Sequence, residues 1–322
     1  MPVVQSRLVG PRFLEPHVAK RVAPSTLYRY QAAALAFSCW ARREGYAPST
    51  VEEWDDLLVE YLYENGHILT RSKFQSVVAA AEYFFPMLRR KLAWCHQVID
   101  GWNVDAVIHH TIPLGKGISK LVAMHMSSLG YARLGVGCVL QAHTGLRPGE
   151  LLAITPNNLL FPEDQGRLLK DMPASIALGV KKGTKVKRPQ YVLLDHRLEL
   201  IVILLRIIVS MTPPHMRMFP YSQSLYRKVL ARVQSDLGLQ LGWTPHSPRA
   251  GFASDSRTEG WTFEEVREAG RWASDSSLRT YLDIIGAANI ATALRAKGLS
   301  PAIRYAAAHW TKYFPAERLA QG

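Results

Sequence analysis

Helical periodicity runs through most of this chain and is interrupted once, by two strand-like segments around a basic turn. Residues 175–180 and 189–194 have the short apolar, β-branched and aromatic texture that is typical of strands. Gly183 lies between them and suits a tight turn. A helical chain with a single strand–turn–strand predicts a mainly α fold with a small β-sheet, which is an α+β architecture.

The length of the chain indicates two domains. It has 322 residues, 48% of them hydrophobic and 20% charged, which is enough to bury two cores. We interpret 1–24 as a loose N-terminal arm, 25–110 as a helical domain and 111–117 as a linker. Residues 118–285 are expected to form the second domain, and 286–322 to add C-terminal helices.

Capping residues and helix breakers set the expected helices. Ser25 and Thr26 predict the start of a first helix, residues 49–53 open a second that ends at Gly66, and Pro86 breaks a third. The expected buried face of the first helix carries Tyr28, Ala32, Leu35, Ala36, Cys39 and Trp40. Further helices are expected at about 118–129, 131–143, 148–154, 196–211, 222–237, 247–258, 262–269, 274–282, 288–297 and 301–313.

Several features favour an intracellular protein. Cys39, Cys95 and Cys138 are too few and too scattered for a disulfide framework or a zinc site, and their apolar helical contexts predict buried free thiols. The N-terminal residues lack the apolar segment of a signal peptide. The longest apolar run, 198–211, is too short and too charged to span a bilayer, so we expect a buried helix there.

The charge of the chain favours a polyanionic partner. The formal net charge is +13, which points to nucleic acid first and to an anionic membrane surface second. Five of the eight residues 181–188 are basic. This segment is either a solvated charge run or localisation signal, or a hairpin tip that enters a DNA groove and delivers one lysine to a leaving oxygen.

Arginine and histidine residues supply half of a candidate active site. Arg147 lies three residues before Glu150, whose carboxylate is expected either to hold the arginine or to complement a helix dipole. His246 and Arg249 are spaced i, i+3 at the start of a helix. Both side chains therefore point the same way, near a helix N-terminus that attracts phosphate.

Two aromatic residues supply the other half. Trp272 carries a hydrogen-bond donor and no acceptor, and Tyr281 follows it by nine residues among polar neighbours. In isolation, a tryptophan or tyrosine would be expected to pack in a core. Together with two arginines, which match phosphate oxygens bidentately, a phenol can act as the nucleophile on a phosphodiester without a metal.

Taken in order, these residues resemble the tyrosine recombinase (phage integrase-like) family. The family pattern reads Thr-Gly-Leu-Arg-x-x-Glu, a hairpin lysine, His-x-x-Arg, Gly-His or Gly-Trp, and a tyrosine nine residues later. The resemblance covers about residues 112–285, and the N-terminal helices loosely resemble the core-binding domain of the family. The matching elements are 144–150, Lys182, His246 with Arg249, 270–272 and Tyr281.

The chain departs from the family pattern at a few positions. Trp272 replaces the commoner histidine, as in Cre-type members. Arg271 stands between Gly270 and Trp272, and Pro148 follows the first arginine. The family lysine best fits Lys182, with Lys181 and Lys185 as close alternatives.

The resemblance implies a site-specific DNA recombinase, similar to integrases and transposases, that forms a 3′-phosphotyrosyl intermediate without a metal, nucleotide or other cofactor. It implies a protein that clamps double-stranded DNA, as a dimer on one site and a homo-tetramer on two, and that acts in the nucleus or the nucleoid. Tyr281 would be the nucleophile, supported by Glu150 and the DNA contacts of Lys187 and Arg188. The remaining implied catalytic residues are Arg147, Lys182, His246, Arg249 and Trp272, and the remaining implied DNA contacts are Lys181 and Lys185.

Other functions were weighed against this resemblance. A type IB topoisomerase-like enzyme shares the chemistry but relaxes supercoils, and a catalytically silent DNA-binding relic would have lost part of the site. A metal nuclease is poorly supported, because His109 and His110 have no matching carboxylate cluster. At the C-terminal end, Trp310, Tyr313 and Phe314 either pack on their own domain or anchor a helix that docks on a neighbouring protomer.

Overall fold

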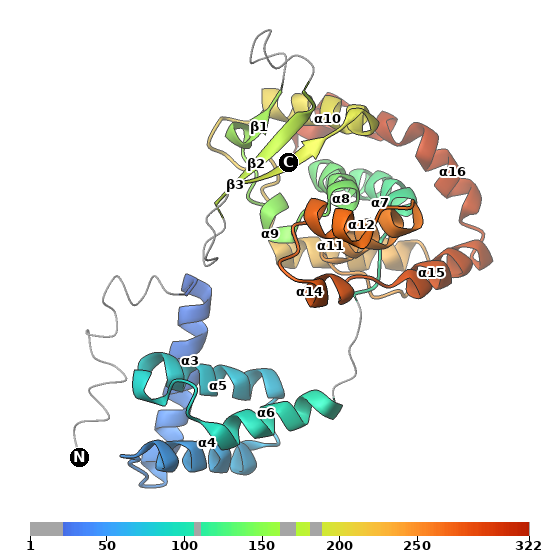
Figure 1. The fold of residues 1–322 in the computed structure, drawn as a ribbon. Coiled ribbons are helices and arrows are strands. Elements are labelled where there is room, and N and C mark those ends of the chain that lie inside the picture. Colours follow the sequence, from blue (N-terminus) through green and yellow to red (C-terminus); the bar gives the residue numbers. More distant parts are fainter. Residues whose placement is uncertain (1–21, 106–110, 162–171, 181–188, 322) are drawn as a thin grey trace. The chain divides into compact units, whose positions relative to one another are not determined.

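The computed structural model describes residues 22–105, 111–161, 172–180 and 189–321 (Figure 1). The chain divides into two compact units, residues 1–107 and 108–322. Helices dominate the described part of both units, and a three-stranded sheet lies in the second. The expected mainly α fold with a small β-sheet is therefore confirmed. The expected N-terminal arm lies almost wholly outside the described residues.

The helices of the first unit surround an aromatic core. Thr50 caps the second helix through a capping box with Glu53, and the break expected at Pro86 is present. The side chains of Trp40, Trp54 and Tyr61 are buried. The elements are α3 (Pro24–Arg43), α4 (Val51–Asn65), α5 (Arg71–Phe84), η2 (Pro86–Leu88) and α6 (Ala93–Asp105).

The first helix differs from the expectation in its start and in its buried face. Ala23 is the N-cap and Pro24 occupies the first helical turn, so Ser25 and Thr26 do not cap the helix. Tyr28 is 75% exposed, and Leu35 and Cys39 are exposed too. The buried face of α3 is the one that carries Phe37, because the ring of Phe37 packs on Trp40, Trp54 and Tyr61. Cys95 and Cys138 are buried as expected.

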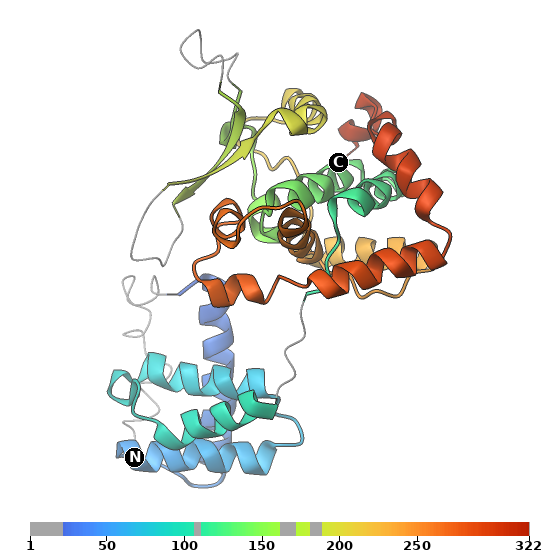
Figure 2. The ribbon, with the colours of Figure 1, turned by 45° about the vertical axis from the view of Figure 1, so that its right-hand side comes forward.

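Two helices, α7 (Lys116–Ser128) and α8 (Ala132–Thr144), form the centre of the second unit (Figures 1 and 2). Nearly every residue of α8 is buried, and α8 contacts α7, α10 and α12. A helix that is apolar all round is expected at such a central place. The other elements are α9 (Pro148–Leu151), η3 (Pro156–Asn158), η6 (His196–Leu198), α10 (Glu199–Ser210), α11 (Gln223–Asp236), α12 (Ser247–Thr258), α13 (Phe263–Ala269), α14 (Asp275–Arg279), α15 (Ile284–Ala296), α16 (Ser300–His309), η7 (Trp310–Tyr313) and α17 (Ala316–Ala320).

The sheet is antiparallel in the order β1 (Leu159–Leu160), β2 (Ala174–Val180) and β3 (Pro189–Leu194). The two expected strands are thus confirmed, and the two-residue β1 was not foreseen. Ile176 and its partner Val192 face the core, whereas Leu193 is exposed on the opposite face. The basic turn 181–188, with the expected Lys181, Lys182, Lys185, Lys187 and Arg188, lies outside the described residues.

Residues 111–117 do not form the expected linker. Leu114 is fully buried in the core of the second unit, and its N–H donates to the carbonyl of Ser247 at 2.9 Å. Gly251 allows this contact, since a β-carbon there would overlap the carbonyl of Leu114. The division between the units falls between residues 107 and 108 instead.

The C-terminal helices pack on their own unit. Trp310 and Phe314 are each 2% exposed and belong to the main core of this unit. The buried guanidinium of Arg133 also donates to the carbonyl of Leu319 at 2.6 Å. This packing is what the own-domain alternative expects, and docking on a neighbouring protomer stays a prediction.

The apolar run 198–211 forms η6 and α10, but only one face of α10 is buried. Leu204 and Leu205 face the core, while Leu200 and Ile203 are about half exposed. The expected buried helix is therefore buried on one face and exposed on the other. Among the described residues, none of the helices combines the length and the hydropathy needed to cross a bilayer.

Candidate active site

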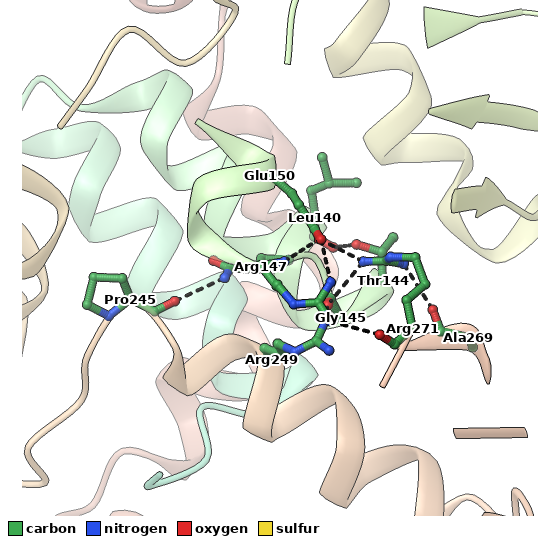
Figure 3. Close-up of polar contacts among 10 residues, drawn as sticks. Leu140, Thr144, Gly145, Arg147, Glu150, Pro245, Arg249, Ala269 and Arg271 are labelled. Carbon is green, nitrogen blue, oxygen red and sulfur yellow. Dashed lines mark hydrogen bonds and ion pairs between the residues drawn. The ribbon is translucent and has the colours of Figure 1, made fainter. Parts of the chain in front are cut away.

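The candidate site is built around the end of α8. Gly145 ends this helix in the left-handed conformation, with φ of 63°, and a β-carbon there would strike the ring of Phe252. Its carbonyl accepts hydrogen bonds from Arg249 and, at 3.4 Å, from Arg271 (Figure 3). The turn after α8 thus gathers two guanidinium groups on one main-chain oxygen.

Arg147 is held from two sides. Its Nη1 donates to Glu150 Oε1 at 2.5 Å, and its Nη2 donates to the carbonyl of Arg271 at 2.8 Å (Figure 3). Its backbone N–H donates to Glu150 Oε2 at 2.8 Å. The ion pair expected from the i, i+3 spacing is therefore present, and it fixes the plane of the Arg147 guanidinium.

Arg249 lies in the first turn of α12 and is only 1% exposed. Its Cζ sits 3.9 Å from the centre of the Trp272 ring, which is a cation–π contact. Its Nη2 is buried and has no hydrogen-bond partner among the described residues. One terminal nitrogen of Arg249 therefore donates to the carbonyl of Gly145, and the other has no protein acceptor among the described residues.

His246 and Tyr281 meet beside Arg249. The Tyr281 hydroxyl lies 3.2 Å from Nδ1 of His246, and the Arg249 Cζ lies 5.6 Å from the Tyr281 ring centre. Tyr281 is half-buried and packs against Trp272, with ring centres 5.7 Å apart. The phenol expected to be the nucleophile is therefore at the edge of the arginine cluster.

Trp272 is 7% exposed, and its indole Nε1 is buried without a partner among the described residues. The ring folds back over the preceding turn, so that a β-carbon at Gly270 would overlap it. The Trp272 side chain packs in a small apolar core that also contains Phe252 and Leu278. Its unused N–H gives it a donor to spare for a ligand.

The electrostatics of the site favour a bound anion. Burial raises the pKa of Glu150, but Arg271 and then the backbone N–H and the guanidinium of Arg147 lower it by more, so the carboxylate stays ionised. Burial lowers the pKa of Arg249, and the nearby Arg147 and Arg271 lower it further. A guanidinium remains protonated in a protein, so this cluster carries more positive than negative charge in a buried place. An anion that met the unpaired donors would relieve that cost.

His246 is the group in this site that can accept a proton at neutral pH. Burial, and then the charges of Arg249, Arg227 and Arg147, lower its pKa below the ordinary value. In the neutral tautomer that carries its proton on Nε2, Nδ1 can accept a hydrogen bond from the Tyr281 hydroxyl, which lies 3.2 Å away.

The structure brings together Arg147, Glu150, His246, Arg249, Trp272 and Tyr281, which are the described members of the expected site. The expected lysines and Arg188 lie outside the described residues.

Two residues that contact the site were not predicted from the sequence. Arg271 was noted there only as a departure from a pattern, although its place beside Gly270 and Trp272 was a signal. Gln141 is fully buried, and its Nε2 donates to the carbonyl of Pro245 at 3.0 Å, one residue before His246. The signal available in the sequence was the position of Gln141, a side-chain amide within a mostly apolar expected helix.

Comparisons with known proteins bear on the fold. Neither a protein-family model nor a curated protein sequence matches this chain. The Tn1549 transposon integrase, in complex with transposon right end DNA, gives a TM-score of 0.56 at 13% identity, covering 91% of this chain and 98% of the other. XerH site-specific recombinase, bound to a palindromic difH substrate, gives 0.53 at 14% identity, covering 79% and 75%.

A lambda integrase dimer bound to a core site gives a TM-score of 0.51 at 15% identity, covering 82% of this chain and 90% of the other. At these identities the likeness shows a shared fold. The chain therefore has the fold of these solved recombinases and integrases.

Proposed function

We propose that this chain is a tyrosine recombinase, a site-specific DNA recombinase of the integrase or transposase kind that forms a 3′-phosphotyrosyl intermediate. One observation carries this proposal: Tyr281, whose hydroxyl lies 3.2 Å from His246, packs beside the buried guanidinium of Arg249, which has a nitrogen without a hydrogen-bond partner among the described residues. A phenol next to an anion receptor is the arrangement that nucleophilic attack on a phosphodiester requires. The fold shared with solved recombinases and integrases supports it.

The proposed first step exchanges one phosphoester for another. The phenolic oxygen of Tyr281 attacks the phosphorus, and its proton passes to Nδ1 of His246. The bond from phosphorus to the 5′-oxygen breaks, and that oxygen leaves as a 5′-hydroxyl after taking a proton from the hairpin lysine, for which Lys182 is the best match to the family pattern. Attack by the 5′-hydroxyl of a second strand reverses these steps, so the bond energy is conserved and neither a metal nor a nucleotide enters the balance.

Arg147 and Arg249 would bind the two non-bridging oxygens and offset the charge that grows on them in the transition state. Both are already oriented by protein oxygens, so little reorganisation is needed when the phosphate binds. Trp272 would donate its free indole N–H to the same phosphate and support the ring of Tyr281. The loss of one such donor typically costs roughly 10²–10³ in rate.

The proposed substrate is double-stranded DNA held by both units of the chain. The net charge of +13 and the five basic residues of 181–188 supply phosphate contacts, with one of Lys181, Lys182 or Lys185 as the general acid. The Tn1549 integrase, XerH and lambda integrase structures contain DNA substrates, which supports DNA as the partner. We propose a dimer on one site and a tetramer that pairs two sites.

A nicked duplex tests the proposal. Oligonucleotide duplexes tiled across the DNA that flanks the gene carry a nick placed so that the released 5′-hydroxyl strand diffuses away. Wild-type protein is expected to form a DNA adduct that survives SDS, and Tyr281→Phe is expected to form none. Tyr63→Phe, at an exposed tyrosine of the first unit, is the matched control and should behave as wild type. Equal adduct from Tyr281→Phe would refute the assignment.

A second assay separates this proposal from a type IB topoisomerase-like enzyme. A plasmid carrying two copies of the trapped duplex should recombine between them. Relaxation of supercoiled DNA without exchange between the two copies would favour the topoisomerase alternative.

A further inference from the structure

We infer that Arg271 is a positioning residue of this site, and this inference rests on the proposed function. Its buried guanidinium holds Glu150, and through Glu150 the phosphate-binding Arg147, in the orientation that the reaction needs. Arg271 itself binds protein oxygens and leaves the phosphate to Arg147 and Arg249.

The backbone of Arg271 is the first sign of a special role. Its φ is 58°, in the left-handed region that favours glycine, and among the described residues Arg90 is the other non-glycine residue with a positive φ. This conformation is unfavourable for a residue that carries a side chain. Such outliers persist where the surrounding structure holds them, and they gather at functional sites.

The side-chain contacts of Arg271 explain what holds it. The side chain is 7% exposed, and its Nη2 donates to Glu150 Oε2 at 3.0 Å (Figure 3). Its Nη1 donates to the carbonyl of Ala269 at 3.0 Å. Both terminal nitrogens are therefore engaged by protein oxygens, while the buried Nε has no hydrogen-bond partner among the described residues.

Arg271 reaches Arg147 by two routes. The carbonyl of Arg271 accepts from Nη2 of Arg147, and the guanidinium of Arg271 fixes the carboxylate that accepts from Nη1 of Arg147. Glu150 is thus shared between two arginines, one oxygen to each side chain. Without the Arg271 guanidinium, Glu150 and Arg147 would still pair, but Glu150 Oε2 would keep only the backbone N–H of Arg147 and would lose the side chain that holds it from the other side.

Substitution by glycine separates these routes. Glycine adopts a φ of 58° without strain, so Arg271→Gly keeps the carbonyl that accepts from Arg147 and removes only the guanidinium. Arg271→Lys keeps the charge and loses the planar fork. Arg90→Gly is the matched control, because Arg90 is exposed, has a φ of 61° and lies in the first unit.

The experiment measures three quantities on the nicked duplex trapped by wild type. They are the single-turnover rate of adduct formation, the Kd for the intact duplex, and the slope of log Kd against log salt. Misplacement of a reacting group by 1 Å costs up to about 10² in rate. We expect Arg271→Gly to slow adduct formation by roughly 10- to 100-fold relative to Arg90→Gly, with equal Kd and equal salt slope, and Arg271→Lys to recover part of the rate.

A double variant tests the route through Glu150. Residues that act through one shared group give non-additive effects. Glu150→Gln is therefore expected to slow the reaction less in the Arg271→Gly background than in wild type.

Several results would overturn the inference. If the adduct rate of Arg271→Gly lies within twofold of that of Arg90→Gly, Arg271 has no positioning role. If the rate effects of Arg271→Gly and Glu150→Gln simply multiply in the double variant, Arg271 does not act through Glu150. A salt slope reduced by about 1 relative to Arg90→Gly would make Arg271 a phosphate ligand. If Arg271→Gly does not fold, Arg271→Lys gives the test: an adduct rate equal to wild type would show that the planar guanidinium of Arg271 is not required. Absence of any wild-type adduct would instead refute the proposed function.

Discussion

The hydroxyl of Tyr281 and Nδ1 of His246 lie 3.2 Å apart, although the two residues are 35 positions apart in the chain. The pair joins the start of α12 to the segment that follows α14. This distance gives the phenol a proton acceptor before any substrate arrives, and it ties the activity of the site to the charge state of one histidine.

The rate of adduct formation should fall in acid as His246 takes up a proton. Burial and the neighbouring arginines lower its pKa, so the ring is neutral at pH 7 and becomes charged only below its ordinary pKa of 6.5. Wild-type single-turnover rates should therefore hold as pH is lowered to that value and decline below it. His246→Gln should be slower near neutral pH and lack this decline.

The same pKa shift makes stability depend on pH. The unfolded chain binds a proton on His246 at a higher pH than the folded chain does. The contribution of His246 to the free energy of unfolding is therefore fully present above the pKa that it has in the unfolded chain. This contribution is lost as pH falls through the lower pKa that it has in the folded chain. Thermal melts of wild type and His246→Gln between pH 7 and pH 5 should diverge in this direction, and parallel curves would contradict it.

Arg249→Met should separate stability from activity. Methionine keeps an apolar side chain against Trp272 but removes a buried charge with an unpaired nitrogen. Replacing buried charge by apolar volume is often neutral or stabilising, so the free energy of unfolding should stay the same or rise. The adduct rate should fall by roughly 10²–10³. Arg232→Met, at an exposed ion pair, should leave the adduct rate unchanged; an equal loss there would contradict a specific role for Arg249.

Gly270→Ala should displace Trp272. A β-carbon at Gly270 would overlap the indole ring, and overpacking of this kind costs about 1–3 kcal/mol. Both the melting temperature and the adduct rate should fall. Gly117→Ala is the control, because a β-carbon at this helical position meets no atom within 4 Å. A wild-type melting temperature for Gly270→Ala would show that Trp272 is not held by this contact.

Trp310→Ala should destabilise the isolated protein in the absence of DNA. The indole is 2% exposed in the core of its own unit, and such truncations cost about 3–5 kcal/mol. Ile285→Ala, at a side chain that is 76% exposed, should change little. Chemical denaturation measures both. An unchanged free energy of unfolding for Trp310→Ala, together with weaker assembly on DNA, would restore the role of this residue as an anchor between protomers.

Local signals in the sequence predicted the helices that frame the site. Residues 247–258 were expected as a helix with His246 and Arg249 at its start, and α12 occupies that range. The helix start at residues 49–53 was also predicted, and Thr50 caps that helix with Glu53. These features depend on residues within one turn of each other, which is the range over which spacing and capping rules act.

Features that depend on distant contacts were missed or misjudged. Arg271 pairs with Glu150 across 121 positions, and no local pattern reveals that pair. The buried face of α3 was assigned wrongly because Phe37 is selected by rings from another helix. Leu114 was assigned to a linker, although its side chain is buried in the core of the second unit and its N–H bonds the start of α12. In each case tertiary packing overrides local preference.

The most direct test of the central claim is to find the atom that carries the DNA. The trapped adduct is digested with nuclease and protease, and mass spectrometry locates the nucleotide that remains on the peptide. The account predicts a nucleotide joined through its 3′-phosphate to the phenolic oxygen of Tyr281. A nucleotide on any other residue, or one joined through its 5′-phosphate, would contradict it.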